Sequence, residues 1–248
     1  MRRTTRALAA VLGLLAAGLP AGADEGFVPL FNGKDLSGWK VPAGDNGHWK
    51  VVDGVIDYDA RSEAAGDKSL WTEKEYGDFV LRVEWRIKET PYVNPGVPII
   101  LPDGTHKKGP DGEDVRMAVP DSDSGIYLRG QSKAQVNIWC WPVGSGEVYG
   151  YRTDPKMPAE VKAGVTPRTI ADRHVGEWNR FEITMKGDAL TVVLNGVTVL
   201  EGARLPGVAA RGPIGLQHHG EMKDGKWVSP PALVQFRNVA VKELTAAR

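Results

Sequence analysis

Gly125-Ile-Tyr-Leu-Arg-Gly130 and Gln135-Val-Asn-Ile-Trp-Cys-Trp141 are the two runs that decide the fold of this chain. Side chains of a β-strand point alternately to its two faces. One face of each run is therefore apolar, because Ile126, Leu128, Val136, Ile138 and Cys140 share it. The opposite face carries amides, aromatic rings and an arginine, namely Tyr127, Arg129, Gln135, Asn137, Trp139 and Trp141. Such a face is either the wet side of an antiparallel sheet or the floor of a sugar-binding site.

The strand pattern continues on both sides of this stretch. Alternating runs or hairpin signals occur at 49–58, 69–72, 78–88, 178–185, 190–200, 214–220 and 234–244. Asp53-Gly54 and Asn195-Gly196 are typical of tight hairpin turns. Helical periodicity is scarce, so the sequence predicts an all-β fold, a two-sheet antiparallel jelly-roll sandwich with long loops.

The segment 89–120 interrupts this pattern, since it is rich in proline and glycine and only 97–101 resembles a strand. A loop of this length predicts an insertion or lid. Its carboxylates at Asp103, Asp111, Glu113 and Asp114 do not follow the spacing of an EF-hand calcium loop. The histidines at 48, 106 and 174 also lack the spacing of zinc ligands. We therefore expect no metal site and no cofactor, and a divalent cation, although conceivable, is unsupported.

The N-terminal 23 residues have the layout of a secretory signal peptide. Arg2, Arg3 and Arg6 precede a short apolar run, and small residues at 21–23 offer a cleavage site. The run is too short for a membrane span. We expect a periplasmic or secreted protein whose residues 24–248 form one jelly-roll domain. Its oligomeric state is not predicted.

Charge and cysteine content exclude other classes. Removal of the leader takes away three of the 31 basic residues and none of the 31 acidic ones, which leaves a formal charge of −3. A nucleic-acid partner is therefore not expected. Cys140 is the one cysteine of the chain, so no intramolecular disulfide can form. Its phase with Val136 and Ile138 favours a structural thiol over a catalytic one.

Several motifs, in the same order, are similar to those of the 3-keto-disaccharide hydrolase family. They are Phe27-Val-Pro-Leu-Phe-Asn-Gly-Lys-Asp-Leu-Ser-Gly-Trp39, Asp78-Phe-Val-Leu-Arg-Val-Glu-Trp-Arg86, Asp123-Ser-Gly-Ile-Tyr-Leu-Arg129, Trp178-Asn-Arg-Phe181, and Gly212-Pro-Ile-Gly-Leu-Gln-His-His-Gly220 with Val234-Gln-Phe-Arg-Asn238. The resemblance covers residues 26–244. It implies a concanavalin A-like or laminin-G-like jelly roll, and cleavage of glycosides already oxidised at C3 of the sugar.

The implied reaction needs particular groups. A ketone at C3 acidifies the C2 proton, so a base can remove it and the group at C1 can leave by elimination. Such a site requires a general base, donors for the enolate oxygen and an acid for the leaving oxygen. It does not require the paired carboxylates of ordinary glycosidases.

The candidate catalytic residues are Glu84 and His219 as bases and Arg129 as the group that holds the ketone oxygen. Each has a structural alternative. Glu84 could form an ion pair with Arg82, Arg86 or Arg129. His219 could cap backbone groups, and Arg129 could belong to a structural ion pair. The candidate substrate-binding residues are Gln135, Asn137 and Gln217 for hydroxyl groups, Tyr127, Trp139 and Trp141 for stacking, and Glu147 and His218. Core packing is the alternative for the tryptophans. Lys68, Asp123 and Arg237 are weaker candidates for the same cleft.

The expected partner is thus a carbohydrate, an oxidised glycoside. A second hypothesis is a non-catalytic carbohydrate-binding module, because jelly rolls serve as lectins as readily as enzymes. A structural surface protein would leave the ionisable groups Glu84, Arg129 and His219 unexplained.

Overall fold

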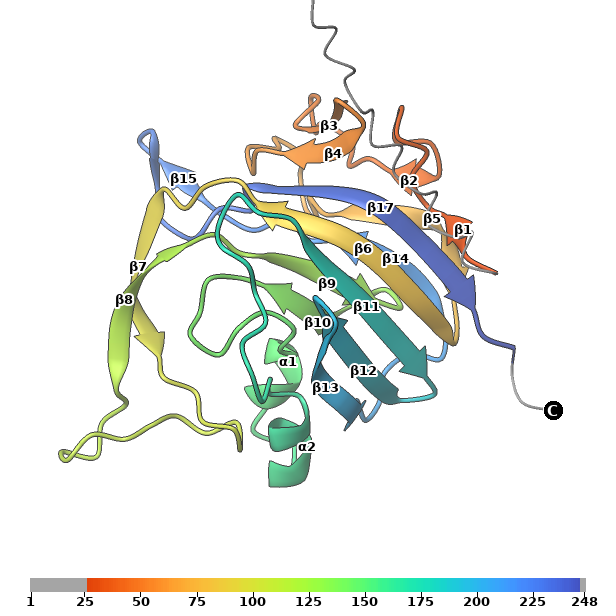
Figure 1. The fold of residues 1–248 in the computed structure, drawn as a ribbon. Coiled ribbons are helices and arrows are strands. Elements are labelled where there is room, and N and C mark those ends of the chain that lie inside the picture. The colour runs from red at the N-terminus through yellow and green to blue at the C-terminus, as the bar shows by residue number, and fades with distance from the viewer. Residues whose placement is uncertain (1–25, 246–248) are drawn as a thin grey trace, which may run out of the picture.

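The computed structural model of the chain describes residues 26–245, and the predicted leader lies outside them. The fold is all-β, as predicted, with two large antiparallel sheets stacked as layers (Figure 1). The first sheet has eight strands: β13 (Val197–Arg204), β12 (Ala189–Leu194), β11 (Asn179–Lys186), β6 (Phe79–Ile87), β17 (Val234–Glu243), β4 (Val55–Tyr58) and β3 (Trp49–Val52) in this order, with β1 (Val28–Pro29) on β17. The second has five: β10 (Gln131–Ile138), β9 (Ser124–Leu128), β14 (Gly212–Leu216), β5 (Leu70–Tyr76) and β2 (Trp39–Lys40).

Period-two patterns of the sequence place the core between these sheets. In β6, Phe79, Leu81, Val83, Trp85 and Ile87 are buried, while the residues between them are more exposed. Ile126, Leu128, Val136 and Ile138 enter the same core from the second sheet. The opposite face of β9 and β10 is thereby turned away from the core, which leaves it available to a ligand.

Both predicted hairpin turns are present. Asp53 and Gly54 have φ of 51° and 77°, and Asn195 and Gly196 have φ of 53° and 85°. Two successive residues with positive φ match the right-handed twist of the flanking strands, and Asp-Gly and Asn-Gly tolerate that conformation best. These turns connect β3 to β4 and β12 to β13.

The segment 89–120 is more regular than expected. β7 (Tyr92–Pro98) and β8 (Arg116–Asp121) pair with each other as a two-stranded arm that projects from the sandwich (Figure 1). Prolines are tolerated here because neither strand is flanked by a further strand on both sides. Asp103 and Asp111 accept hydrogen bonds from residues two positions later, and Asp114 forms ion pairs with His106, Lys108 and Arg116.

Small elements complete the fold, and the sequence did not predict them. Helices α1 (Tyr149–Arg152) and α2 (Ala159–Gly164) lie below the sheets in Figure 1, and β15 (Met222–Lys223) pairs with β16 (Lys226–Trp227). Within residues 26–245, neither helix has the length and apolar character that a bilayer crossing requires.

Candidate functional site

A pocket of about 360 Å³, here called the site pocket, lies on the face of the five-stranded sheet that is turned away from the core. The ends of β9, β10 and β14 meet here, and β7 and α1 complete the wall. Its lining consists of Asn94, Asp123, Gln135, Asn137, Trp139, Trp141, Tyr149, Gln217, His219 and Pro230. The volume is within the range of small-molecule sites.

Amide side chains form the floor of the site pocket. Gln135 pairs with Tyr127 across the sheet, and its Nε2 donates a hydrogen bond to Oε1 of Gln217 and to the carbonyl of Ser124 at 3.2 Å. These contacts of Gln135 depend on the absence of a side chain at Gly125, since a Cβ there would lie 2.7 Å from Cγ of Gln135. Asn137 is buried beside them, and no side-chain hydrogen bond holds its amide within the described chain. The floor therefore presents orientable donors and acceptors to a polyhydroxyl ligand.

Indole rings form one wall. Trp139 and Trp141 stack with centroids 4.2 Å apart and planes 3° apart, and Tyr149 meets both edge-on. The indole Nε1 of Trp139 donates to the carbonyl of Gly144 at 2.8 Å. That of Trp141 donates to Oδ2 of Asp121 at 3.0 Å. Because both N–H groups are bound within the protein, the rings are held in place as a rigid apolar wall.

Asp123 and His219 form an acid–base pair at the edge of the pocket. His219 Nδ1 lies 2.6 Å from the carbonyl oxygen of Pro230, and a carbonyl only accepts, so the Nδ1–H donates this bond. The other ring nitrogen, Nε2, faces Oδ2 of Asp123 at 4.0 Å. The Asp123 side chain is only 17% exposed. Burial raises its pKa to about 7, against the attraction of His219.

Six of the predicted residues come together in the site pocket: Gln135, Asn137, Trp139, Trp141, Gln217 and His219. Tyr127 lies beside them on the same sheet face, paired with Gln135, where it stacks on Trp71 at 5.2 Å. Burial raises the pKa of Tyr127 to about 12. Its phenol is therefore neutral near pH 7.

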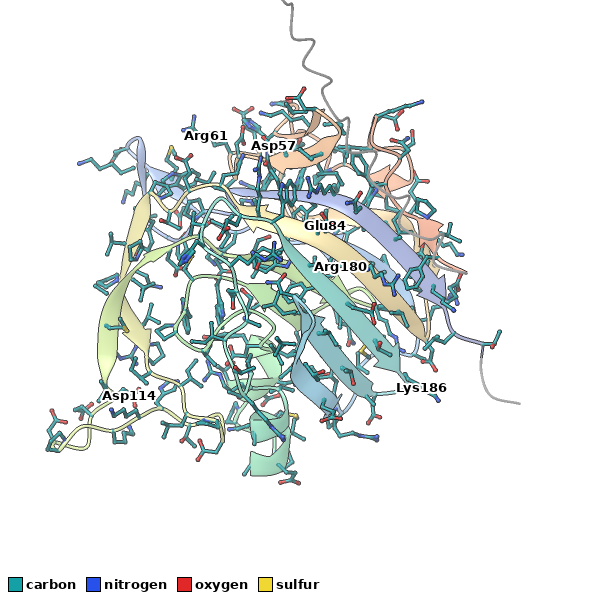
Figure 2. All side chains as sticks on the ribbon, viewed as in Figure 1. Asp57, Arg61, Glu84, Asp114, Arg180 and Lys186 are labelled. Atoms are coloured by element: carbon teal, nitrogen blue, oxygen red, sulfur yellow. The ribbon has the colours of Figure 1, made fainter. Side chains whose placement is uncertain are left out.

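Glu84 does not lie with them. It is on β6 of the eight-stranded sheet, on the face opposite the core, near Arg180 (Figure 2). Its Oε2 accepts a hydrogen bond from Nε of Arg237 at 2.7 Å, and Arg237 also stacks on Trp178. The expected alternative, an ion pair, is found, although with a different arginine. Alternation predicts which face of a strand a residue occupies, but it does not predict which of the two sheets the strand joins.

Arg129 is also separate from the pocket. Its side chain is 1% exposed, and its guanidinium donates to the carbonyls of Gly77, Gly187 and Ala209 and to Asp78, at 2.7–2.9 Å. The predicted alternation fails here because β9 ends at Leu128 and Arg129 adopts a φ of 50°. Its donors are committed to the fold, so a shared site of Glu84, Arg129 and His219 is not formed.

Glu147 and His218 also lie outside the pocket lining. Glu147 is fully buried in an ion pair with Arg152, and burial raises its pKa to about 7. His218 Nδ1 lies 2.7 Å from the hydroxyl of Tyr58, and burial lowers its pKa to about 4. In the stretch 217–219 alternate residues face opposite ways, so Gln217 and His219 line the pocket and His218 does not.

Four lining residues were missed or underrated from the sequence. Asp123 was only a weak candidate, and Asn94, Tyr149 and Pro230 were not candidates. The one available signal was the sequence Asp121-Ser-Asp-Ser-Gly125, which places two carboxylates directly before a strand. Asn94 and Tyr149 come from the arm and from α1, and their approach to the sheet is a tertiary feature.

A two-sheet β-sandwich with an amide floor, an indole wall and an acid–base pair defines a carbohydrate-active jelly roll. The chain belongs to the family of 3-keto-alpha-glucoside-1,2-lyase-like domains, whose family model matches residues 26–242.

Two solved structures share the fold, both from Parabacteroides distasonis ATCC 8503 and both with a provisional glycosyl hydrolase assignment. One is 23% identical with a TM-score of 0.54, and the match covers 89% of this chain and 84% of that chain. The other is 21% identical with a TM-score of 0.53, and covers 89% of this chain and 95% of that chain. A comparison with curated proteins gave no match.

Proposed function

We propose that the protein is an exported enzyme that cleaves 3-keto-glycosides in the site pocket. The observation that carries this proposal is the pair Asp123 and His219, which combines a carboxyl of pKa about 7 with an imidazole whose Nε2 is free to accept a proton. A carboxyl whose pKa lies near neutral pH suits general acid–base chemistry. The pair lies beside an indole wall and an amide floor, where a sugar ring can be stacked and its hydroxyl groups bound.

In the proposed reaction His219 is the base. Its Nε2 removes the C2 proton, and the electrons of that C–H bond form an enolate whose oxygen is the former ketone at C3. The amide of Asn137 donates to this oxygen. The enolate then reforms the ketone as the C1–O bond breaks, and the protonated carboxyl of Asp123 gives its proton to the leaving oxygen. Water added to the resulting enone completes a net hydrolysis, while release of the enone makes the reaction a lyase reaction.

In this scheme His219 alone is the base, Asn137 takes the oxygen-binding role expected of Arg129, and Asp123 is added as the acid. Glu84 is paired on the outer face of the other sheet, and Arg129 has no free donor directed at the pocket. The acid role also predicts a pH dependence. Since Asp123 must be protonated to act, turnover should decrease as the pH rises above about 7.

The test uses methyl 3-keto-glucoside and its unoxidised parent, with methanol release as the readout. The wild-type protein should release methanol from the keto sugar alone. Asp123→Asn and His219→Gln should each reduce turnover by ~100-fold or more. Glu84→Gln is the matched control and should retain wild-type turnover, because its carboxyl is remote from the site pocket.

A carbohydrate-binding module is the competing function. It would bind the keto sugar or its parent at the same pocket and release methanol from neither. Binding detected by calorimetry, with no turnover at any pH between 5 and 9, would therefore replace the enzyme proposal with this one.

A further inference from the structure

Asp121 lies where the arm joins the sandwich, and its side chain binds two groups that line the site pocket. It is the last residue of β8 and pairs with Tyr92 at the start of β7. Its Oδ2 accepts a hydrogen bond from Nδ2 of Asn94 at 3.1 Å and another from Nε1 of Trp141 at 3.0 Å. Asn94 and Trp141 belong to the pocket lining, whereas Asp121 does not. One oxygen behind the lining therefore connects the arm to the indole wall.

The surroundings of Asp121 suit a carboxylate. The residue is 0% exposed, and a buried carboxylate is costly unless donors surround it. Its partners are N–H donors, because the backbone N–H of Cys140 lies 3.3 Å from Oδ1 and completes the set begun by Asn94 and Trp141. Hydrogen bonds to an ionised acceptor are stronger than those between neutral groups. They oppose the effect of burial, which raises the pKa of Asp121.

The two residues after Asp121 bind the segment that orients His219. The Ser122 hydroxyl donates to the carbonyl of Pro231 at 2.5 Å, and the backbone N–H of Asp123 donates to the same carbonyl at 3.2 Å. The preceding carbonyl, that of Pro230, accepts the Nδ1–H bond of His219. Residues 121–123 therefore set the arm, the indole wall and the acid–base pair relative to one another.

The charge of Asp121 also acts on the proposed acid. Burial is the main reason for the raised pKa of Asp123, His219 opposes it, and the like charge of Asp121 adds to it. The remaining titratable groups near Asp123 are Tyr127, Cys140 and Glu147. The phenol and the thiol are neutral near pH 7, since burial raises the pKa of each to about 12, and Glu147 is paired with Arg152. The carboxylate of Asp121 is thus the negative charge that favours the protonated form of Asp123.

We propose that Asp121 is a positioning residue of the site pocket, which fixes Asn94 and the Trp141 ring for the sugar and places a negative charge near the acid Asp123. It acts through these groups and does not touch the substrate. The inference deepens the proposed function and rests on it for the effect on turnover. Its effects on sugar binding and on the Trp141 ring do not require catalysis, so they can be measured separately.

The first test is the kinetics of Asp121→Asn. This variant keeps the shape of the side chain, but one of the two acceptor oxygens becomes an NH2 group and the charge is lost. KM for methyl 3-keto-glucoside should rise by ~10-fold, because Asn94 and Trp141 are no longer both held. The decrease of kcat with rising pH should begin at a pH lower by ~0.5 unit or more, since the loss of a like charge favours ionisation of Asp123. A role in folding alone would not move this pH profile.

Asp57→Asn is the matched control. Asp57 of β4 is 8% exposed, and its Oδ1 accepts from Lys88 at 2.8 Å and from Gln235 at 2.7 Å on the eight-stranded sheet. The control loses the same charge and a similarly bound acceptor outside the site pocket. It should therefore change neither KM nor the pH profile. Equal changes in Asp57→Asn and Asp121→Asn would overturn the proposal.

The second test follows the indole N–H groups by NMR. In Asp121→Asn the Trp141 N–H should exchange with solvent ~10-fold faster or more, while that of Trp139, bound to the carbonyl of Gly144, should keep its rate. Unchanged Trp141 exchange, KM and pH profile in the folded variant would reject the positioning role. If Asp121→Asn does not fold, Asn94→Ala removes one of the same bonds from the arm, and an unchanged KM in that variant rejects the role instead.

A binding measurement separates this proposal from the proposed function. If the wild type cleaves no glycoside, calorimetric titration with methyl 3-keto-glucoside takes the place of KM. Binding that is ~10-fold weaker in Asp121→Asn and unchanged in Asp57→Asn would then support the positioning role, while the catalytic proposal fails. Equal affinities of the wild type and Asp121→Asn would reject the positioning role, whatever the turnover.

Discussion

At the residue scale, the environment of Asp123 opposes ionisation. The carboxyl is 17% exposed, and Nε2 of His219 lies 4.0 Å from it, beyond hydrogen-bond distance. Asp121, two residues earlier, adds a like charge. A surface aspartate would be ionised well below neutral pH, whereas this one changes charge near pH 7. The structure thus maintains, at a cost in stability, a group that can donate and accept protons under physiological conditions.

This cost predicts how Asp123→Asn changes stability with pH. The pKa of Asp123 is about 7 in the folded protein and near 3.8 in the unfolded chain. Folding therefore favours the protonated form: its contribution is full below pH 4 and is lost as the pH rises through 7. At pH 8 the Asn variant should have a larger free energy of unfolding than the wild type, by on the order of 2–4 kcal/mol. Urea denaturation at pH 4 and pH 8 measures this difference, which should vanish at pH 4.

The opposite result would remove Asp123 from its proposed role. If Asp123→Asn destabilises the protein at pH 8, the carboxylate is a structural acceptor in its ionised form. Asp123→Asn should instead stabilise the protein at pH 8 and inactivate it, as expected when a functional group is kept at a cost in stability.

At the element scale, Arg129 joins three turns at one end of the sandwich. It binds Gly77 and Asp78 between β5 and β6, Gly187 between β11 and β12, and Ala209 before β14. These turns belong to both sheets, so one buried guanidinium ties the layers together. These four hydrogen bonds are all made within the fold, although the position of Arg129 in the sequence suggested the active site.

We expect Arg129→Met to lower the free energy of unfolding by about 2–5 kcal/mol, because it removes the four hydrogen bonds that a buried guanidinium makes to Gly77, Gly187, Ala209 and Asp78. Denaturant unfolding measures the loss. The kcat of the folded fraction at low temperature should stay within about twofold of wild type. A kcat reduced by orders of magnitude in a well-folded variant would instead place Arg129 in the reaction.

The approach of β10 to β9 depends on a glycine. Gly125 leaves the space in which the Gln135 side chain lies flat on the sheet and contacts Gln217. Gly125→Ala should displace Gln135 and raise KM for the keto sugar by ~10-fold, with a smaller effect on kcat, since the acid–base pair is untouched. The stability loss should be ~1–3 kcal/mol. Steady-state kinetics provide the measurement, and Gly164→Ala, where the added Cβ finds ordinary contact distances, is the matched control.

At the scale of the whole molecule, the lining of the site pocket is assembled from distant segments. The arm supplies Asn94, β10 supplies Gln135 and Asn137, the segment after β10 supplies the indoles, and the segment after β14 supplies Gln217 and His219. The arm is further tied to α1, since His106 Nε2 lies 3.2 Å from Arg152 Nη1 and Asp114 holds the other side of His106. The labelled Asp114, between β7 and β8, lies far from Glu84 of β6 in Figure 2.

Export is also a prediction for the whole chain. Residues 1–23 have the features of a cleavable leader, so expression in a bacterium with an outer membrane should give a periplasmic or medium product that begins at Asp24. Mass spectrometry of that product checks the cleavage site. Full-length chain confined to the cytoplasm would contradict the expectation.

Much of the fold follows from local patterns in the sequence. Alternation along β6, β9 and β10 determined which side chains enter the core, and Asp53-Gly54 and Asn195-Gly196 determined two hairpins. The same alternation placed Gln135, Asn137, Trp139 and Trp141 on one face, and the family motifs extended the prediction to Gln217 and His219. These features depend on neighbours within a few residues, so they are readable from the chain.

Only the tertiary structure decided which groups meet. Sequence patterns did not show that β6 joins the other sheet, which separates Glu84 from the site pocket. They also did not show that Arg129 has a positive φ and that its side chain binds the turns between strands instead of lining the pocket. Equally, the raised pKa of Asp123 and the hydrogen bonds of Asp121 with Asn94 and Trp141 depend on residues far away in the chain. A strand pattern specifies faces, whereas the desolvation and the long-range contacts that create a reactive group exist only once the two sheets have packed.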